Sequence, residues 1–361
     1  MTSIIQKILD KARWAPSGDN VQSWRFTVLN DYAIIVTSRD TRADVVYDYL
    51  GRPSQIALGA LLETIKIAAS HFSYQAHWQL IPAEQTDSDH SCLRYRIELS
   101  PLHQMPTENL YAEIEKRSVY RRRLSCQNLS AAHLQILQAA LGPAYRLRLF
   151  SSKQDKRRFA RIWWDNALIR LTMPEAYPVH KSVIAWNSQY SEDKIPDQAI
   201  GADKLSLKLM RWALQSWRRV HFMNHYLGGT LLPRLQLDLF PALHCGAHFT
   251  LEACQQARLP EDFVAAGQAL QRFWLSATQL GLQMQPALTP LIFSWYASDQ
   301  QICTQDQACW QAILQLHQRL QQQLGAVELS HCVFMGRLGY GDAAHARSLR
   351  LPLRHLLENS D

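Results

Sequence analysis

The sequence predicts an α+β fold in which amphipathic helices alternate with short strands. Apolar residues recur at helical spacing in residues 3–14, 54–72 and 262–281, whereas apolar and polar residues alternate in residues 93–99, as in a half-buried strand. The chain has 361 residues, of which 47% are hydrophobic. It is therefore long enough for two modules, or for one large fold with an insertion, and it can bury a full core.

The first hundred residues are expected to form a helix, two paired strands, a second helix and two more strands. The turn residues Asn30 and Asp31 indicate the strand pair. Ser54 is expected to be the N-cap of the second helix, whose stripe of small and apolar residues suits a buried central position. The predicted ranges are 3–14, 24–29, 32–37, 54–72, 78–81 and 93–99.

A second series of helices and strands follows residues 100–109, which have two prolines and no periodicity and are predicted to be a linker. Its first helix, capped by Ser130, leads into a strand just as residues 3–14 do, so the two halves resemble each other coarsely. Residues 174–260 are expected to be irregular apart from one helix. The predicted elements are helices at 130–141, 152–173, 201–226, 262–281 and 306–325, strands at 145–150 and 331–340, and a loop at 283–290.

Composition and charge limit the partners and the compartment. No apolar run approaches the roughly 18 residues of a membrane span, and the N-terminus lacks the features of a signal peptide. The seven cysteines are odd in number and irregularly spaced, as in reduced thiols. We therefore expect a cytoplasmic protein without a membrane partner. The net charge of +7 suits an anionic cofactor or substrate, and because no nucleic-acid motif accompanies it, no nucleic-acid partner is expected.

A polar turn, Ser17-Gly18-Asp19-Asn20, separates two apolar elements near the N-terminus. A hydroxyl, an unhindered glycine amide and an asparagine side chain suit the polar edge of a flat heteroaromatic ligand, or a phosphate. The alternative is a helix stop with capping polar residues and no ligand.

Arginines gather in two short motifs. Arg117 and Arg121 lie four residues apart in "KRSVYRRRLS", a spacing that suits a clamp for a phosphomonoester, although a solvated run of charge before a helix is the alternative. Arg347 and Arg350 in "RSLRLP" are uninformative alone. The segment "HCGAHFTLEAC" lacks a second ligand pair at zinc-finger spacing, so no metal is predicted there. The sequence also lacks the dinucleotide, Walker and nucleophile-elbow motifs.

Four segments in this order resemble the nitroreductase family of FMN-dependent oxidoreductases: "APSGDNVQSWRF", "RSVYRR", "GQALQRFWLSATQLGLQMQP" and "RLGYGD…RSLRLPLRHLL". The first departs from the family pattern at Ser23, where proline is usual. The second has Val119 at the middle of the clamp, and the hydroxyl has moved to Ser118. The resemblance covers about residues 1–100, 110–150 and 262–357.

The resemblance implies an FMN site in which arginines bind the phosphate and the backbone amides of Ala287 and Leu288 face the flavin N5. No catalytic side chain is implied, because hydride transfer needs no side-chain acid or base. The implied cofactor-binding residues are Ser17, Gly18, Asp19, Asn20, Gln22, Arg117, Ser118, Arg121, Gln285, Pro286, Ala287, Leu288, Arg347 and Arg350.

The order of the motifs implies a duplicated fold. In the family, one subunit gives the clamp and its partner gives the turn. Here residues 1–105 have the turn but no clamp before it, and residues 106–361 have the clamp but no such turn. We therefore expect a nitroreductase-like fold duplicated in one chain, a pseudo-dimer with central antiparallel sheets flanked by helices. The second half would carry an insertion at about 151–261.

The function implied by the resemblance is FMN-dependent oxidation and reduction. NAD(P)H would serve as the transient reductant and a small molecule as the acceptor, in a ping-pong hydride transfer by a monomer or homodimer. The alternative is a degenerate member that binds flavin, or serves as a partner protein, without turnover. In that case residues 151–261 would form a lid, and Trp186, Trp212 and Trp217 would fill the place where nicotinamide stacks.

Overall fold

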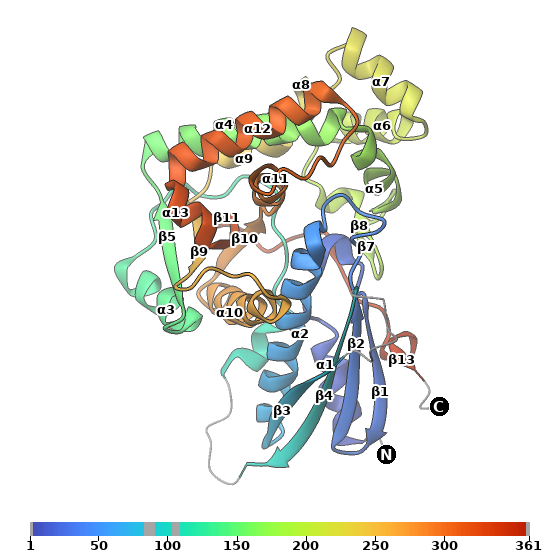
Figure 1. Ribbon diagram of the computed structural model, residues 1–361, viewed down its shortest axis with the longest axis vertical. Helices are drawn as coiled ribbons and strands as arrows, with labels where there is room; N and C mark the ends of the chain where they lie inside the picture. Colours follow the sequence, from blue (N-terminus) through green and yellow to red (C-terminus); the bar gives the residue numbers. More distant parts are fainter. Residues whose placement is uncertain (1–2, 83–90, 103–108, 359–361) are drawn as a thin grey trace.

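Two sheets, antiparallel apart from one short C-terminal strand, form the frame of the molecule (Figure 1). The computed structural model describes residues 3–82, 91–102 and 109–358. Helices pack against both sheets, so the predicted α+β class is confirmed. The strands of the two sheets are β1 (Trp24–Asn30), β2 (Ala33–Arg39), β3 (Tyr74–Ile81), β4 (Cys92–Pro101) and β13 (Leu357–Glu358) in the first, and β5 (Tyr145–Phe150), β9 (Ala247–Ala253), β10 (Leu282–Pro286) and β11 (Cys332–Tyr340) in the second.

The two halves have the same strand order. The first sheet runs β1-β2-β4-β3 and the second β5-β9-β11-β10, with antiparallel neighbours throughout. A helix precedes the first strand of each half, and a helix of 20 residues connects the second strand to the third. These helices are α1 (Ile4–Ala12) and α2 (Arg52–His71) in the first half, and α3 (Ala131–Leu141) and α10 (Pro260–Gln279) in the second.

Capping side chains account for the starts of several helices. Ser3 caps α1 by accepting a hydrogen bond from the Gln6 amide, and the Ser130 side chain caps α3 as predicted. The prediction for Ser54 is wrong, since α2 begins at Arg52 after Gly51, whose φ of 74° is easy only for glycine. The Ser54 amide and hydroxyl instead donate to the Asp48 carboxylate.

Helices α2 and α10 cross at the centre of the molecule and hold the halves together (Figure 1). Polar contacts accompany their apolar packing. Gln271 Nε2 donates to Thr64 Oγ1 at 2.9 Å, and Arg272 Nη1 donates to Glu63 Oε1 at 2.8 Å. The small and apolar stripe of α2 thus faces another helix, as its composition predicts.

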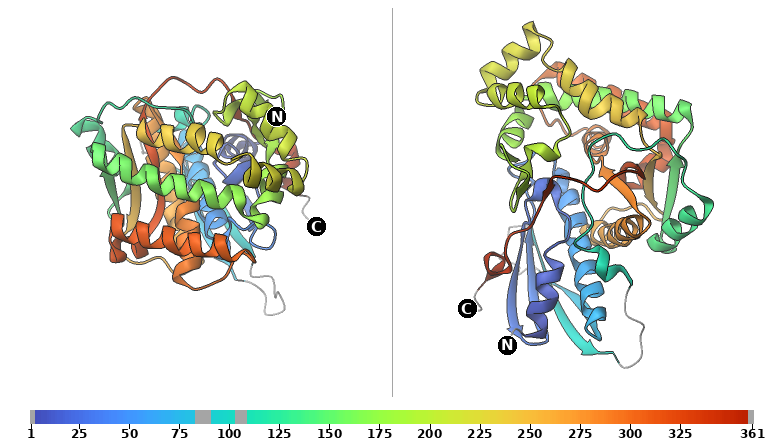
Figure 2. Two further views of the ribbon diagram at one scale, coloured as in Figure 1. Left: turned by 90° about the horizontal axis from the view of Figure 1, so that it is seen from above. Right: turned by 180° about the vertical axis from the view of Figure 1, so that it is seen from behind.

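A large insertion lies between β5 and β9 and covers one end of the molecule (Figure 2). It contains more helix than the sequence predicts. The single helix expected at 201–226 is two helices, because the chain turns at residues 214–216 and Ser216 caps the second. The elements are α4 (Lys153–Thr172), α5 (Tyr177–Ser182), β6 (Ile184–Ala185), β7 (Tyr190–Ser191), β8 (Ile195–Pro196), α6 (Lys204–Ala213), α7 (Trp217–Tyr226), α8 (Leu231–Pro233), a π-helix (Arg234–Leu239) and α9 (Phe240–Leu243).

The C-terminal segment returns to the first half. It leaves the second sheet at Tyr340 and ends in β13, which pairs in parallel with β1 at Phe26 and Thr27 (Figure 2). The predicted half boundary at residues 105 and 106 lies outside the described residues. In the described part of the chain, no helix is both long and apolar enough to cross a bilayer. The remaining elements are α11 (Thr289–Ser298), α12 (Gln307–Leu324), α13 (Ala326–His331) and β12 (Arg347–Ser348).

Candidate functional site

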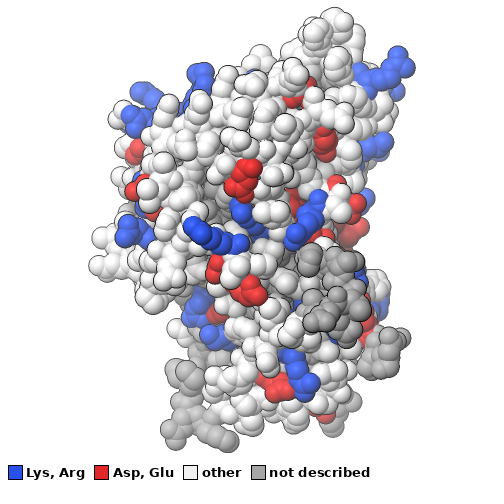
Figure 3. All heavy atoms as spheres, viewed as in Figure 1, with Lys and Arg blue, Asp and Glu red and all other residues white. Residues whose placement is uncertain are grey.

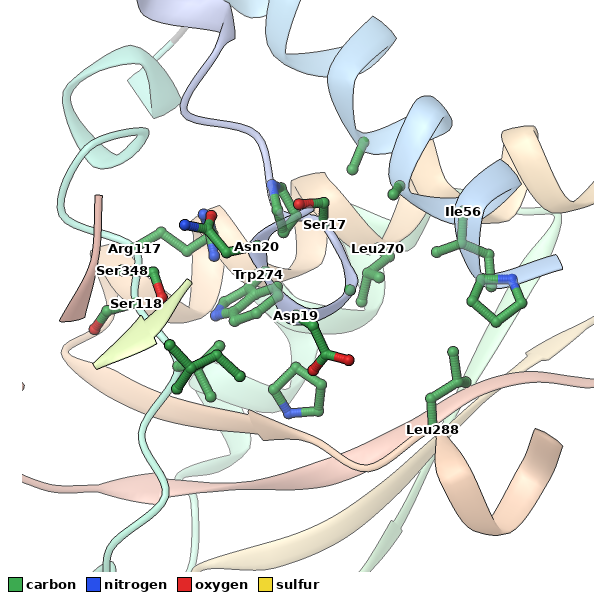
Figure 4. Close-up of a pocket in the computed structure, with 18 of the residues that line it drawn as sticks. Ser17, Asp19, Asn20, Ile56, Arg117, Ser118, Leu270, Trp274, Leu288 and Ser348 are labelled. Atoms are coloured by element: carbon green, nitrogen blue, oxygen red, sulfur yellow. The ribbon is translucent and has the colours of Figure 1, made fainter. Parts of the chain in front are cut away.

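A cavity of about 180 Å³ lies where the two halves meet the C-terminal segment (Figure 4). Its walls come from the turn after α1, the first half of α2, residues 117–121, the middle of α10, the loop after β10 and residues 347–350. These segments are far apart in the sequence. The cavity therefore exists only when both halves and the C-terminal return are in place.

Most of the predicted site residues lie around this cavity. Of the fourteen, eleven line it, and Gln285 and Ala287 line an adjoining cavity. Only Gln22 lines neither. The eleven are Ser17, Gly18, Asp19, Asn20, Arg117, Ser118, Arg121, Pro286, Leu288, Arg347 and Arg350.

The turn after α1 has an unusual backbone. Asp19, Asn20 and Gln22 have φ values of 48°, 66° and 51°, in the left-handed region that non-glycine residues seldom adopt. The Ser17 hydroxyl accepts a hydrogen bond from the Gln22 amide at 3.1 Å and fixes the turn. Such a backbone persists only when its surroundings hold it.

Asn20 is buried and joins the turn to the insertion. Its Nδ2 donates to the carbonyl oxygens of Glu192 and Lys194, whereas its Oδ1 has no hydrogen-bond partner among the described residues. Buried polar atoms normally have a partner, so this oxygen suits an N–H group of a ligand in the cavity.

Gln22 does not line the cavity but connects the segments that form its wall. Its Nε2 donates to the carbonyl oxygens of Asn20 and Glu192, and its Oε1 accepts from the Leu351 amide at 2.9 Å. One fully buried side chain therefore ties the turn, the insertion and the C-terminal segment together.

Arg117, Arg347 and Arg350 form a cationic group at the cavity. Arg117 and Arg350 are buried, and none of the three forms a salt bridge with a described carboxylate. They donate hydrogen bonds to backbone carbonyls, such as Arg117 to Trp14 and Arg350 to Ala15, both at 2.9 Å. Within the described part of the chain, the Nε atoms of Arg117 and Arg347 have no hydrogen-bond partner.

Burial and mutual repulsion destabilise the charged forms of this group. Burial, followed by the charges of Arg350 and Arg347, lowers the pKa of Arg117. Burial, followed by Arg347 and Arg13, lowers the pKa of Arg350 to about 9. An anion would relieve both effects, and phosphate matches the forked donors of arginine. The arginines present therefore fit a phosphate group.

Asp19 lies at the boundary between the two cavities and points into the first (Figure 4). Burial raises the pKa of its carboxyl, and the nearby charges of Arg121 and Arg170 oppose this rise. Burial likewise lowers the pKa of Arg121, and Asp19 opposes that fall. This end of the site thus carries balanced charges, unlike the arginine group.

The loop after β10 offers one free amide instead of the two expected. The Ala287 amide donates to the Met335 carbonyl at 2.9 Å and is not available to a ligand. The Leu288 amide has no such partner in the described structure and remains the candidate for the flavin N5. Gln285 Oε1 accepts from buried Arg337 Nε at 2.7 Å.

A second cavity, of about 620 Å³, adjoins the first beneath the insertion. The two share Asp19, Arg121, Pro286 and Leu288 in their walls. Most of its lining side chains are apolar, many of them from α6 to α8 and the turns between these helices, and a polar group lies near the shared wall. In that group Arg170 pairs with Asp238 at 2.8 Å.

The three insertion tryptophans do not line either cavity. Trp186, Trp212 and Trp217 are absent from both walls, and Trp212 is 43% exposed. They therefore do not fill a place for nicotinamide in this structure. A space of small-molecule size remains under the insertion.

Several residues of the site were given no role by sequence reasoning, although Trp274 and Arg337 lie in segments that resemble the family. Trp274 of α10 lines the cavity, and the Arg117 guanidinium lies over its ring, with Cζ 4.5 Å from the ring centroid. Ile56 of α2 lines it from the other half. Arg337 is fully buried and donates to the Arg121 and Arg122 carbonyls, so it supports the clamp segment. The helical stripes of α2 and α10 were visible, but periodicity does not show which part of a stripe meets a cavity.

The "HCGAHFTLEAC" segment lies apart from this site. His248 is fully buried and stacks on Phe159 at a centroid distance of 4.6 Å, whereas Cys254 is exposed. Within residues 3–82, 91–102 and 109–358, no group of three or more histidine, cysteine or acidic side chains is arranged to hold a metal ion.

Comparisons with known proteins agree with the sequence motifs over the first part of the chain. Residues 2–167 match the model of the nitroreductase family. No curated protein matches the chain. Two crystal structures are similar in part: a nitroreductase-like family protein from Bacillus cereus, and a protein from Anabaena variabilis provisionally described as a nitroreductase.

The structural similarities are weak. The Bacillus cereus protein is 12% identical, with a TM-score of 0.36, and the match covers 71% of this chain and 98% of that one. The Anabaena variabilis protein is 13% identical, with a TM-score of 0.39, and the match covers 86% and 69%. Neither TM-score is high enough to define the fold or function of this chain. The nitroreductase family itself indicates flavin-dependent oxidoreductase activity. The family model thus relates residues 2–167 of this chain to the nitroreductase family.

Proposed function

We propose that this protein is an FMN-dependent oxidoreductase that uses NAD(P)H to reduce a small acceptor by ping-pong hydride transfer. The observation that carries the proposal is the group of Arg117, Arg347 and Arg350. It places guanidinium groups that bond only backbone carbonyls, and no described carboxylate, in the wall of a cavity built from both halves. A phosphomonoester is the ligand that this group suits.

The residues of the chain would have separate tasks toward FMN, which supplies the redox chemistry when bound. The arginines would hold its phosphate. Asn20 Oδ1 and the Leu288 amide, neither of which has a partner among the described residues, would bind and orient the ring. The insertion would limit the access of water, because its helices cover the second cavity.

The alternative is a flavin-binding protein without turnover, in which the insertion acts as a permanent lid. The second cavity favours an enzyme, since about 620 Å³ remains beneath the insertion and adjoins the first cavity. This volume lies within the usual range of small-molecule sites. A nicotinamide or an acceptor could then approach without unfolding the insertion.

Anaerobic reduction separates these two functions. The purified protein is loaded with FMN, and its visible absorbance is followed while NADH or NADPH is added. Bleaching by either nucleotide, followed by recovery on addition of an electron acceptor, is expected of the enzyme. Bound FMN that dithionite bleaches but neither nucleotide does would assign the protein to the binding class.

A further inference from the structure

The outer surface of α6 to α8 carries an unusual concentration of exposed apolar side chains. Leu205 and Tyr226 are 75% and 68% exposed. On α6 the apolar residues Leu205, Leu209 and Trp212 follow one another at helical spacing and form a stripe, of which Leu209 also lines the second cavity. We call the exposed apolar residues of this region that do not line that cavity the outer patch: Leu205, Trp212, Phe222, Tyr226 and Leu231. Exposed apolar side chains gathered in this way mark an interaction site.

Basic residues border this patch. Lys204, Lys208 and Arg211 are exposed, and each precedes a residue of the α6 stripe, so they form a parallel stripe beside it. Residues 204–237 contain six Lys or Arg residues and no Asp or Glu. Figure 3 shows Lys and Arg side chains at the upper right margin, where α6 and α7 lie in Figure 1.

The same helices are also apolar on the inside. Met210, Leu214, Val220 and Met223 line the second cavity from α6, α7 and the turn between them. No residue of α7 is fully buried, although the helix has large apolar residues on both faces. The inner apolar residues thus line a cavity, whereas those of the outer patch are exposed and have no cover from the described residues.

We propose that the outer patch adsorbs to an anionic lipid surface. An exposed apolar face bordered by Lys and Arg lies in the headgroup region and needs no spanning segment. Anionic headgroups complement the basic stripe, because Lys and Arg side chains are attracted to a negatively charged surface. A second copy of this chain would bring like charges together, which opposes self-association through the patch. The sequence predicts no membrane partner because it lacks a spanning segment, but adsorption to the headgroup region does not require one.

Vesicle cosedimentation tests the proposal on the full chain, and it needs no flavin chemistry. The protein is mixed with vesicles of phosphatidylglycerol and phosphatidylcholine, or with phosphatidylcholine alone. Binding is expected only to the anionic vesicles and is expected to fall at high salt. The double variant Lys208→Gln with Arg211→Gln should bind the anionic vesicles at least about tenfold more weakly than the wild type. Leu205→Ser should also reduce binding.

The matched control is Ile302→Ser, because Ile302 is 71% exposed, close to the value for Leu205, but lies outside the patch. It should bind like the wild type. Equal binding to both kinds of vesicle, or no binding to either, would overturn the proposal. Light scattering tests whether a second copy of the chain covers the patch instead of lipid. A wild-type dimer that Leu205→Ser converts to a monomer would show that it does and would overturn the proposal.

Discussion

Gly59 of α2 and Gly267 of α10 hold matching positions in the central helix pair, and each faces the backbone of the other helix. A Cβ atom on Gly59 would lie 1.8 Å from the Val264 carbonyl oxygen, and one on Gly267 would lie 2.0 Å from that of Ile56. Both glycines are the eighth residue of their helices, and both carbonyls belong to the fifth, counting from Arg52 and Pro260. The contact is therefore reciprocal, as in a two-fold interface.

The first prediction concerns this close approach. Gly59→Ala and Gly267→Ala should each lower the free energy of unfolding by about 1–3 kcal/mol or more, because the helices must separate to admit a methyl group. Denaturant unfolding measures the change. Gly18→Ala is the control, since no atom lies within 4 Å of its Cβ position. Equal effects of all three substitutions would show that the helices do not meet at these glycines.

The second prediction concerns the arginine group. Arg350→Ala should weaken FMN binding by about tenfold or more, because one charge-assisted contact to phosphate contributes about 1.5–3 kcal/mol. Riboflavin, which lacks the phosphate, should bind far more weakly than FMN to the wild type and should be little affected by the substitution. Fluorescence titration with both ligands measures this. Equal affinity for the two flavins would remove the phosphate assignment.

The third prediction separates the two amides of the loop after β10. Leu288→Pro removes the free amide and should slow the reduction of bound FMN by NAD(P)H. Ala287→Pro removes a hydrogen bond to Met335 and should mainly lower stability, by about 1 kcal/mol. Stopped-flow reduction and thermal unfolding are measured for both variants. Wild-type reduction kinetics in Leu288→Pro would place the flavin ring elsewhere.

The fourth prediction is the stoichiometry of one FMN per 361-residue chain. The chain supplies one turn, at Asn20, and one clamp, at Arg117 and Arg121, and the structure brings them to one cavity. Flavin absorbance is compared with protein mass for the wild type, Asn20→Ala and Arg121→Ala. Both variants should retain less FMN. Two flavins per chain, or full occupancy in both variants, would contradict the assignment of turn and clamp to a single site.

The fifth prediction concerns stability at acid pH. Burial, with smaller effects from Arg337 and Lys156, lowers the pKa of His248 to about 3, and the Ala242 carbonyl opposes this. The pKa of an unfolded histidine is about 6.5. Between these values only the unfolded state takes up the proton, so the free energy of unfolding should fall with falling pH by about 1.4 kcal/mol per unit.

The variant His248→Phe should lack this contribution. Its free energy of unfolding, measured in denaturant from about pH 6.5 downward, should therefore fall less steeply than that of the wild type by about that amount. The slope is the relevant quantity, because the lost hydrogen bond to Ala242 shifts stability at every pH. Parallel profiles would show that His248 becomes protonated in the folded state.

The parts of the site that the sequence could predict are those with side-chain motifs. Asn20 and Arg117 are almost a hundred residues apart, yet the division of motifs between the halves places them at one cavity, where the structure has them. The paired strands and α1 also follow from local patterns, since a turn pair and a capping serine act within a few residues.

The parts that the sequence could not predict depend on backbone groups and on register. The backbone carbonyls of Glu192 and Lys194 accept hydrogen bonds from Asn20. Every residue has a backbone carbonyl, so no sequence pattern marks these two as partners of Asn20. The engagement of the Ala287 amide follows from how β10 pairs with β11, which sequence patterns do not specify to one residue. Ser54 resembled an N-cap, but Asp48 binds it instead, and that contact depends on the path of the preceding loop.

The polar contacts beside the central glycines differ on their two sides. Thr64 meets Gln271 through a neutral hydrogen bond, and Glu63 meets Arg272 through an ion pair. A symmetric homodimer has the same residue on both sides of its axis, so any substitution alters both sides at once. A single chain has no such constraint. Each side of this interface is able to accumulate its own changes, and a ligand site on one side is able to persist after its counterpart on the other has been lost.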